Sequence, residues 1–64
     1  MFLNLLSEMT RYKIKKGVLA NKLGISREAL RNKFAGKNEF TMVEIDTIKS
    51  MFPDKTYEYL FKRD

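Results

Sequence analysis

Four polar side chains in the segment 27–32 carry the groups that recognise base edges in duplex DNA. Arginine donates paired hydrogen bonds to guanine, asparagine pairs with adenine, and glutamate accepts from the cytosine amino group. On a helix these residues share one outer face: Arg27, Glu28, Arg31 and Asn32. The alternative is an ordinary solvated face, and Glu28 has a second interpretation, in which it holds a neighbouring arginine in place.

The residues ahead of this segment predict a hinge between two short helices. Ala20 lies four positions before Gly24, and Ser26 lies two positions after it. Glycine adopts the left-handed conformation at little cost, and serine caps the helix that follows. Ala20 lets the two helices cross closely, and Ile25 would fix the turn to the core. This is the spacing of a helix-turn-helix, which places its second helix in the DNA major groove.

Positive charge is concentrated around this hinge. Residues 11–37 contain nine lysines and arginines and one acid, a local balance of +8, against +5 for the whole chain. Cations beside phosphates set affinity and orientation without choosing sequence. The candidates for such contacts are Lys13, Lys15, Lys16, Lys22, Lys33, Lys37 and Asn38. We favour Lys16 and Lys37 among them; the alternative for each lysine is plain solvation.

Apolar residues recur at helical spacing throughout, and no alternating run is long enough to indicate a strand. We therefore expect an all-α fold, a compact five-helix domain over residues 1–64. The expected helices are about Phe2–Lys13, Lys16–Leu23, Arg27–Ala35, Thr41 to just before Pro53, and about Lys55–Phe61. Thr41 and Glu44 form a capping box at the start of the fourth helix, and Asp54 is the expected cap of the fifth.

The apolar stripes of these helices predict the core. The expected core residues are Phe2, Leu5, Leu6, Met9, Tyr12, Leu19, Ala20, Leu23, Leu30, Phe34, Met42, Ile45, Ile48, Phe52, Tyr57, Leu60 and Phe61. A second interpretation applies to Val18, Tyr57, Tyr59 and Phe61, which either cover the small core or form an exposed dimer contact.

Composition argues against several function classes. The chain has no cysteine and no histidine, so we expect no disulfide, no usual zinc site and no histidine or cysteine in catalysis. No phosphate-binding glycine loop is present. We therefore expect no enzyme activity, no metal, no cofactor and no small-molecule substrate. The apolar N-terminus is too short to span a membrane and lacks signal-peptide features, which favours a soluble intracellular protein. A pI near 9.7 suggests a polyanionic partner.

The chain resembles the Cro/repressor helix-turn-helix proteins of bacteriophages, which have the lambda-repressor-like five-helix fold. The matching residues are Leu19-Ala20, Leu23-Gly24-Ile25-Ser26, Leu30, Phe34, Gly36, Glu44-Ile45 and Tyr59-Leu60-Phe61. The resemblance implies base contacts by Ser26, Arg27, Glu28, Arg31 and Asn32, and phosphate contacts by Lys16, Lys37 and Asn38. It implies a transcriptional regulator that binds a double-stranded DNA operator as a weakly pairing two-fold dimer. Its expected location is the cytoplasm of a bacterial host, at the nucleoid.

The chain departs from the family pattern in three ways, at four positions. Lys15 stands where a capping serine or threonine is usual, and Gly17 and Val18 stand where polar helix formers are usual. Lys33 occupies a position that is often apolar, so Phe34 has to fill that part of the core. Gly17 costs about 0.5–1 kcal/mol relative to alanine inside a helix, which leaves the helix start open between Lys16 and Val18.

A protein-binding module on the same fold is the competing hypothesis. An antirepressor, an antitoxin or a phage accessory factor would use its surface on another protein. Such a module would not need the basic charge on the third helix, and this charge therefore discriminates between the two hypotheses.

Overall fold

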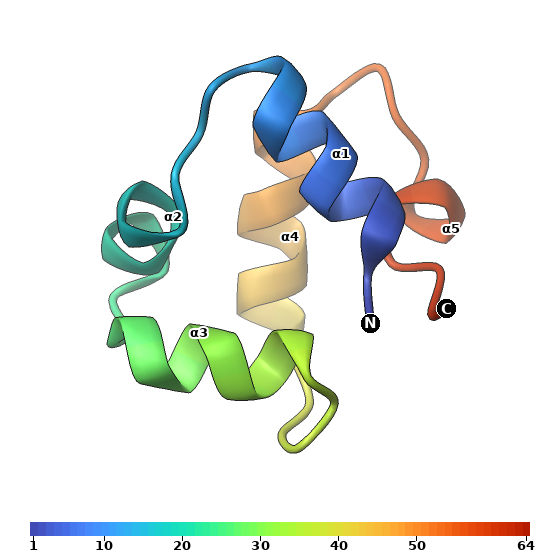
Figure 1. Ribbon diagram of the computed structural model, residues 1–64. Helices are drawn as coiled ribbons and strands as arrows, with labels where there is room; N and C mark the ends of the chain where they lie inside the picture. Colours follow the sequence, from blue (N-terminus) through green and yellow to red (C-terminus); the bar gives the residue numbers. More distant parts are fainter.

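Five α-helices joined by short turns make up the protein, and no β-strand forms in residues 1–64, all of which the computed structural model describes. In chain order the helices are α1 (Leu3–Arg11), α2 (Lys16–Leu23), α3 (Arg27–Phe34), α4 (Met42–Met51) and α5 (Tyr57–Leu60) (Figure 1). The predicted all-α architecture is confirmed. None of the helices combines the length and apolar character needed to cross a lipid bilayer.

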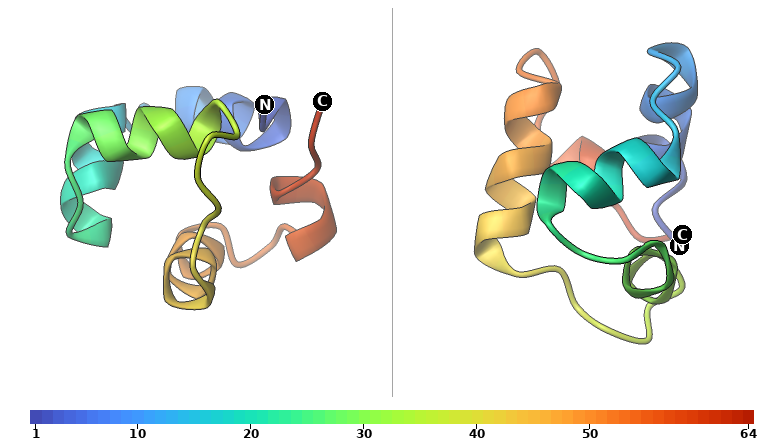
Figure 2. Two further views of the ribbon diagram at one scale, coloured as in Figure 1. Left: turned by 90° about the horizontal axis from the view of Figure 1, so that it is seen from below. Right: turned by 90° about the vertical axis from the view of Figure 1, so that its left-hand side faces the viewer.

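The predicted bend between α2 and α3 is present. Gly24 adopts the left-handed conformation (φ 73°), and the Ile25 N–H donates to the Ala20 carbonyl at 3.0 Å. Ser26 then caps α3, its hydroxyl oxygen accepting from the Ala29 N–H at 3.0 Å. Ala20 is buried in the core, and α2 packs against α3. The two helices cross steeply at one end of the molecule, as both views of Figure 2 show.

The end of α1 differs from the prediction. The helix stops at Arg11, because Lys13 has a positive φ of 58° and the Ile14 N–H turns back to the Met9 carbonyl at 2.7 Å. Tyr12 therefore lies outside the helix and is 54% exposed, although its ring still packs on Phe52 with centroids 5.9 Å apart. The prediction that Tyr12 belongs to the buried stripe is wrong.

The start of α4 has the predicted capping box. The Thr41 hydroxyl accepts from the Glu44 N–H at 3.2 Å, and Glu44 accepts from the Thr41 N–H at 2.9 Å. Glu44 and Ile48, one turn apart, define the inner face of this helix. Met42 lies two residues before Glu44, about 200° around the helix, and is 70% exposed. Its assignment to the core is wrong.

The last helix is shorter than expected and has a different cap. Thr56 is the N-cap, and its hydroxyl oxygen accepts from the Tyr59 N–H at 3.0 Å. The Lys55 N–H donates to the Phe52 carbonyl instead, which places Asp54 and Lys55 in the turn that follows α4. The predicted start at Lys55 with Asp54 as the cap is therefore wrong.

Ten apolar side chains form one continuous core. They are Phe2, Leu5, Met9, Leu19, Ala20, Leu30, Phe34, Ile48, Phe52 and Leu60. The rings of Phe2, Phe34, Phe40 and Phe61 meet edge to face, with centroid separations of 5.5–6.4 Å in the contacts of Phe2. Phe34 is 2% exposed, so it fills the core beside Lys33 as expected.

Of the four side chains expected either to cover the core or to be exposed, one covers the core and three are exposed. Phe61 packs on the rings of Phe2 and Phe40 and so covers the core. Tyr57, Tyr59 and Val18 are exposed. The Tyr57 hydroxyl donates to Asp46 at 3.1 Å, which keeps this ring at the surface rather than in the predicted core.

Candidate nucleic-acid interface

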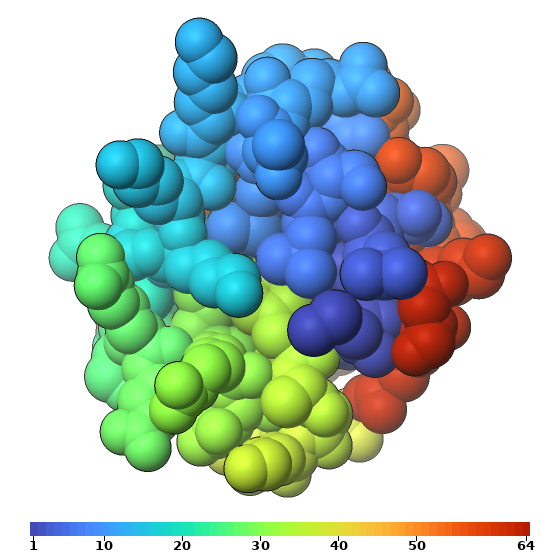
Figure 3. Space-filling model, in the orientation of Figure 1, coloured from blue at the N-terminus to red at the C-terminus, as the bar shows by residue number.

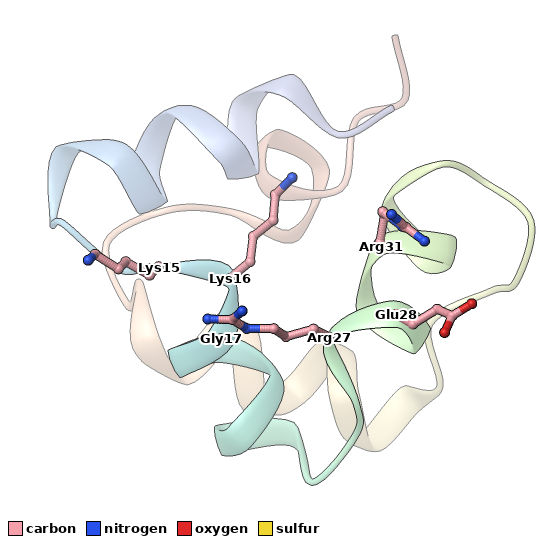
Figure 4. Close-up of a pocket in the computed structure, with 6 residues that line it drawn as sticks. All are labelled: Lys15, Lys16, Gly17, Arg27, Glu28 and Arg31. Carbon is pink, nitrogen blue, oxygen red and sulfur yellow. The ribbon is translucent and has the colours of Figure 1, made fainter.

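The first turns of α2 and α3 face each other across a basic cleft. Its lining consists of Lys15, Lys16, Gly17, Arg27, Glu28 and Arg31 (Figure 4). Four cations and one carboxylate therefore share this surface, and no hydrophobic side chain lines it. In the space-filling view, side chains of α2 and α3 stand out from the same side of the molecule (Figure 3).

The cations of the cleft have no acidic partner within the protein. All four salt bridges use cations elsewhere, namely Arg11, Lys33, Lys55 and Arg63. The Lys16 ammonium lies 5.8 Å from the centroid of the Phe34 ring and forms no ion pair with a carboxylate of the protein. Four cations against one carboxylate, none of them in an ion pair, give the cleft a net positive charge that attracts an anionic ligand.

Arg27 points from the start of α3 to the start of α2. A Cβ atom on Gly17 would lie 2.8 Å from Nε and 2.9 Å from Nη2 of Arg27, so the guanidinium occupies the space of the missing side chain. Figure 4 shows Arg27 extended toward Gly17, while Glu28 points the other way. The sequence pattern marked Gly17 only as a cost to the helix. The available signal was a glycine in the first helical turn with no turn to explain it.

The other predicted base-contacting residues differ in accessibility. Glu28 and Arg31 are exposed, and Glu28 forms no ion pair with either arginine, so it does not hold one in place. Asn32 is half-buried and does not line the cleft. Ser26 is exposed, but its hydroxyl oxygen already caps α3.

Six of the seven predicted phosphate-contacting residues fall into three groups. Lys15 and Lys16 line the cleft, and α2 begins there without a side-chain cap, as the lysine at position 15 led us to expect. Lys22 lies in the last turn of α2, at the other end from the cleft. Lys13, Lys37 and Asn38 are exposed outside the cleft lining.

Lys33 does not have the position predicted for a phosphate contact. Its ammonium donates to Glu44 Oε1 at 2.7 Å and to the Glu39 carbonyl at 3.2 Å, and its side chain is 12% exposed. Because its charge is paired with an internal carboxylate, Lys33 is not available for a phosphate contact. Burial raises the pKa of Glu44, but the hydrogen bonds from Lys33 and Thr41 outweigh it, and the pKa lies below its ordinary value.

No three acidic, histidine or cysteine side chains gather as a metal site would require. Comparison of the chain with models of known protein families, with curated proteins and with solved structures gave no match.

Proposed function

We propose that the protein is a sequence-specific regulator that binds double-stranded DNA, of the Cro/repressor type, with α3 lying in the major groove. The observation that carries this proposal is the cleft between α2 and α3, with its four unpaired cations. Unpaired cations suit a DNA-binding surface, because their hydrogen-bond donors are not used within the protein and can bind phosphates and base edges.

The arrangement of the two helices supports the same proposal. Ala20, Gly24 and Ser26 bring α2 and α3 together so that the first turn of α3 lies exposed beside the start of α2. A recognition helix contacts bases with its N-terminal residues, and the preceding helix approaches the backbone. The cleft lies where both kinds of contact would be made.

Residue roles follow from chemistry and exposure. We assign guanine contacts to Arg27 and Arg31, and a cytosine contact to the unpaired Glu28. Lys15 and Lys16 would hold phosphates beside the cleft. Lys37 and Asn38 remain candidates for backbone contact, because both are exposed just beyond α3. Asn32 and Ser26 come second among the base contacts, since one is half-buried and the other caps α3.

The wider proposal follows from this mode of binding. The protein would occupy an operator as a two-fold dimer with half-sites about one helical turn apart. It would act as a binding protein rather than an enzyme, with no cofactor. Its place of action would be the bacterial cytoplasm, at the nucleoid of a phage or prophage host.

A selection from random DNA duplexes, followed by binding titrations at several salt concentrations, tests the proposal. We expect a preferred sequence and an affinity that falls steeply with salt, because cations beside phosphates release counterions on binding. Arg31→Ala should change the preferred sequence and cost about 1–3 kcal/mol at the selected site. Absence of salt-dependent duplex binding would instead favour a protein-binding module.

A further inference from the structure

The three glycines of the chain are required for two different physical reasons. Gly24 and Gly36 have φ values of 73° and 84°, where side chains are strained, and nothing lies within 4 Å of where their Cβ would be. Gly17 has no positive φ, so its backbone would accept alanine. The space of its missing side chain, however, is filled by Arg27. A glycine is therefore required at position 17 because Arg27 fills the adjacent space, and not because the backbone turns there.

The atoms that fill the space beside Gly17 belong to the guanidinium group of Arg27. Arg27 Nε, Nη2 and Cζ would lie 2.8, 2.9 and 3.3 Å from a Cβ on Gly17; the first two distances are closer than such atoms pack, and the third is tight. Arg27 forms no ion pair within the protein, and no side-chain hydrogen bond joins it to another residue. Its guanidinium thus packs against α2 and uses none of its donors in a hydrogen bond or ion pair within the protein.

We infer that Gly17 is a positioning residue that directs the Arg27 guanidinium into the cleft beside Lys15 and Lys16, ready for duplex DNA. This inference rests on the DNA-binding function proposed above. A free arginine loses much rotamer freedom when it binds, and a side chain already held in place loses less. Gly17 contributes to affinity and base preference through Arg27, without touching DNA itself.

The inference predicts opposite changes in stability and in binding. Gly17→Ala adds a good helix former to α2, and the atoms it displaces are the far end of a long, exposed side chain that can turn to another rotamer. The melting temperature should therefore stay the same or rise. Binding should weaken, because the guanidinium can no longer lie across the start of α2. A purely structural glycine would lose stability and binding together.

The experiment compares five forms of the full chain on the duplex that the wild type selects. They are the wild type, Gly17→Ala, Arg27→Ala, the double variant carrying both changes, and Asn21→Ala as a control. Asn21 is exposed on the same helix and does not line the cleft, so its replacement also raises helix propensity without entering the site. Affinity, preferred sequence and melting temperature are measured for each.

We expect Gly17→Ala to weaken binding about tenfold, to alter the base preference and to keep the melting temperature, while Asn21→Ala binds like the wild type. In the Arg27→Ala background, Gly17→Ala should have no further effect. An equal loss in that background would mean that the new methyl group itself obstructs DNA, which overturns the inference. Unchanged binding by Gly17→Ala also overturns it while leaving the DNA proposal intact, whereas a wild type that binds no duplex overturns both.

Discussion

The Lys33 ammonium and Glu44 Oε1 lie 2.7 Å apart and join the last turn of α3 to the first turn of α4. Glu44 uses the same oxygen to accept from the Thr41 N–H, so one carboxylate caps α4 and ties it to α3. Both side chains are nearly buried, which makes the pair less screened than a surface ion pair. The contact fixes the end of α3 that lies away from the cleft.

Glu44→Gln should destabilise the protein by about 1–3 kcal/mol at neutral pH, because it leaves a mostly buried ammonium without its anion. Urea denaturation measures the change. Asp54→Asn is the control, since Asp54 pairs with Lys55 at the surface at 3.8 Å and should contribute little. Equal effects of the two substitutions would contradict the role given to Glu44.

The ion pair of Lys33 and Glu44 also predicts how the stability of the protein falls at acid pH. The pKa of Glu44 in the folded protein lies below its ordinary value of 4.5, so the unfolded chain takes up a proton first as pH falls. The stabilisation is complete above the unfolded pKa and is lost as pH falls through the folded pKa. The difference between wild type and Glu44→Gln should therefore shrink at acid pH in urea titrations.

Gly24→Ala should cost about 1–2 kcal/mol, because an alanine at φ 73° is strained even though nothing surrounds its side chain. Gly24→Asn should cost less, since asparagine tolerates this conformation. Chemical denaturation of both variants, with Gly17→Ala beside them, checks the prediction. An alanine at position 24 that is as stable as the wild type would mean that the bend does not need a left-handed residue.

The sequence predicted the bend well because local chemistry determines it. A left-handed glycine and a capping serine act through their own backbone neighbours, so the position of each is visible in the sequence. The end of α2 at Leu23 and the Thr41 cap were predicted for the same reason. The start of α2 has no side-chain cap, and the sequence therefore left it open between Lys16 and Val18. The start of α5 was not predictable in this way, because Asp54 and Thr56 can both cap a helix and lie close together. The turn around Pro53 decides that Thr56 is the cap.

The candidate site was predicted by residue type but not by orientation. Charge counting placed Lys33 with the other lysines, yet a carboxylate eleven residues away binds its ammonium. Gly17 and Arg27 lie ten positions apart, and their contact exists only because the helices cross. Pairings of this kind depend on tertiary packing, which neither helical periodicity nor local charge reports.

Tyr59→Phe should lower the melting temperature more than Tyr57→Phe. The Tyr59 hydroxyl donates to Glu8 Oε2 at 2.9 Å, and Glu8 is fully buried with its other oxygen lacking a hydrogen bond and 3.5 Å from Arg11 Nε. Removing the hydroxyl leaves this carboxylate without a hydrogen-bond donor. Tyr57 binds Asp46, which is exposed and can be hydrated instead. Thermal melts at neutral pH compare the two variants.

Alkaline pH should lower the stability of the protein through the same contact between Tyr59 and Glu8. The hydrogen bond to Glu8, together with burial, raises the pKa of Tyr59 above its ordinary value of 10.0. The unfolded chain then loses the phenol proton first, so stability is complete below the unfolded pKa and is lost as pH rises through the folded one. Tyr59→Phe should flatten this alkaline loss in melts; an unchanged alkaline limb would contradict the contribution of the Glu8 contact.

Lys16→Ala should reduce the salt dependence of duplex binding, if Lys16 lies beside a phosphate as we propose. Each phosphate contact contributes about 0.9 to the slope of log affinity against log salt concentration, so the slope should fall by about that amount. Lys62→Ala removes the same charge from an exposed position outside the cleft and should leave the slope unchanged. Fluorescence anisotropy with a labelled duplex measures both slopes. Equal slopes for the two variants would mean that net charge, rather than the cleft between α2 and α3, governs the attraction to DNA.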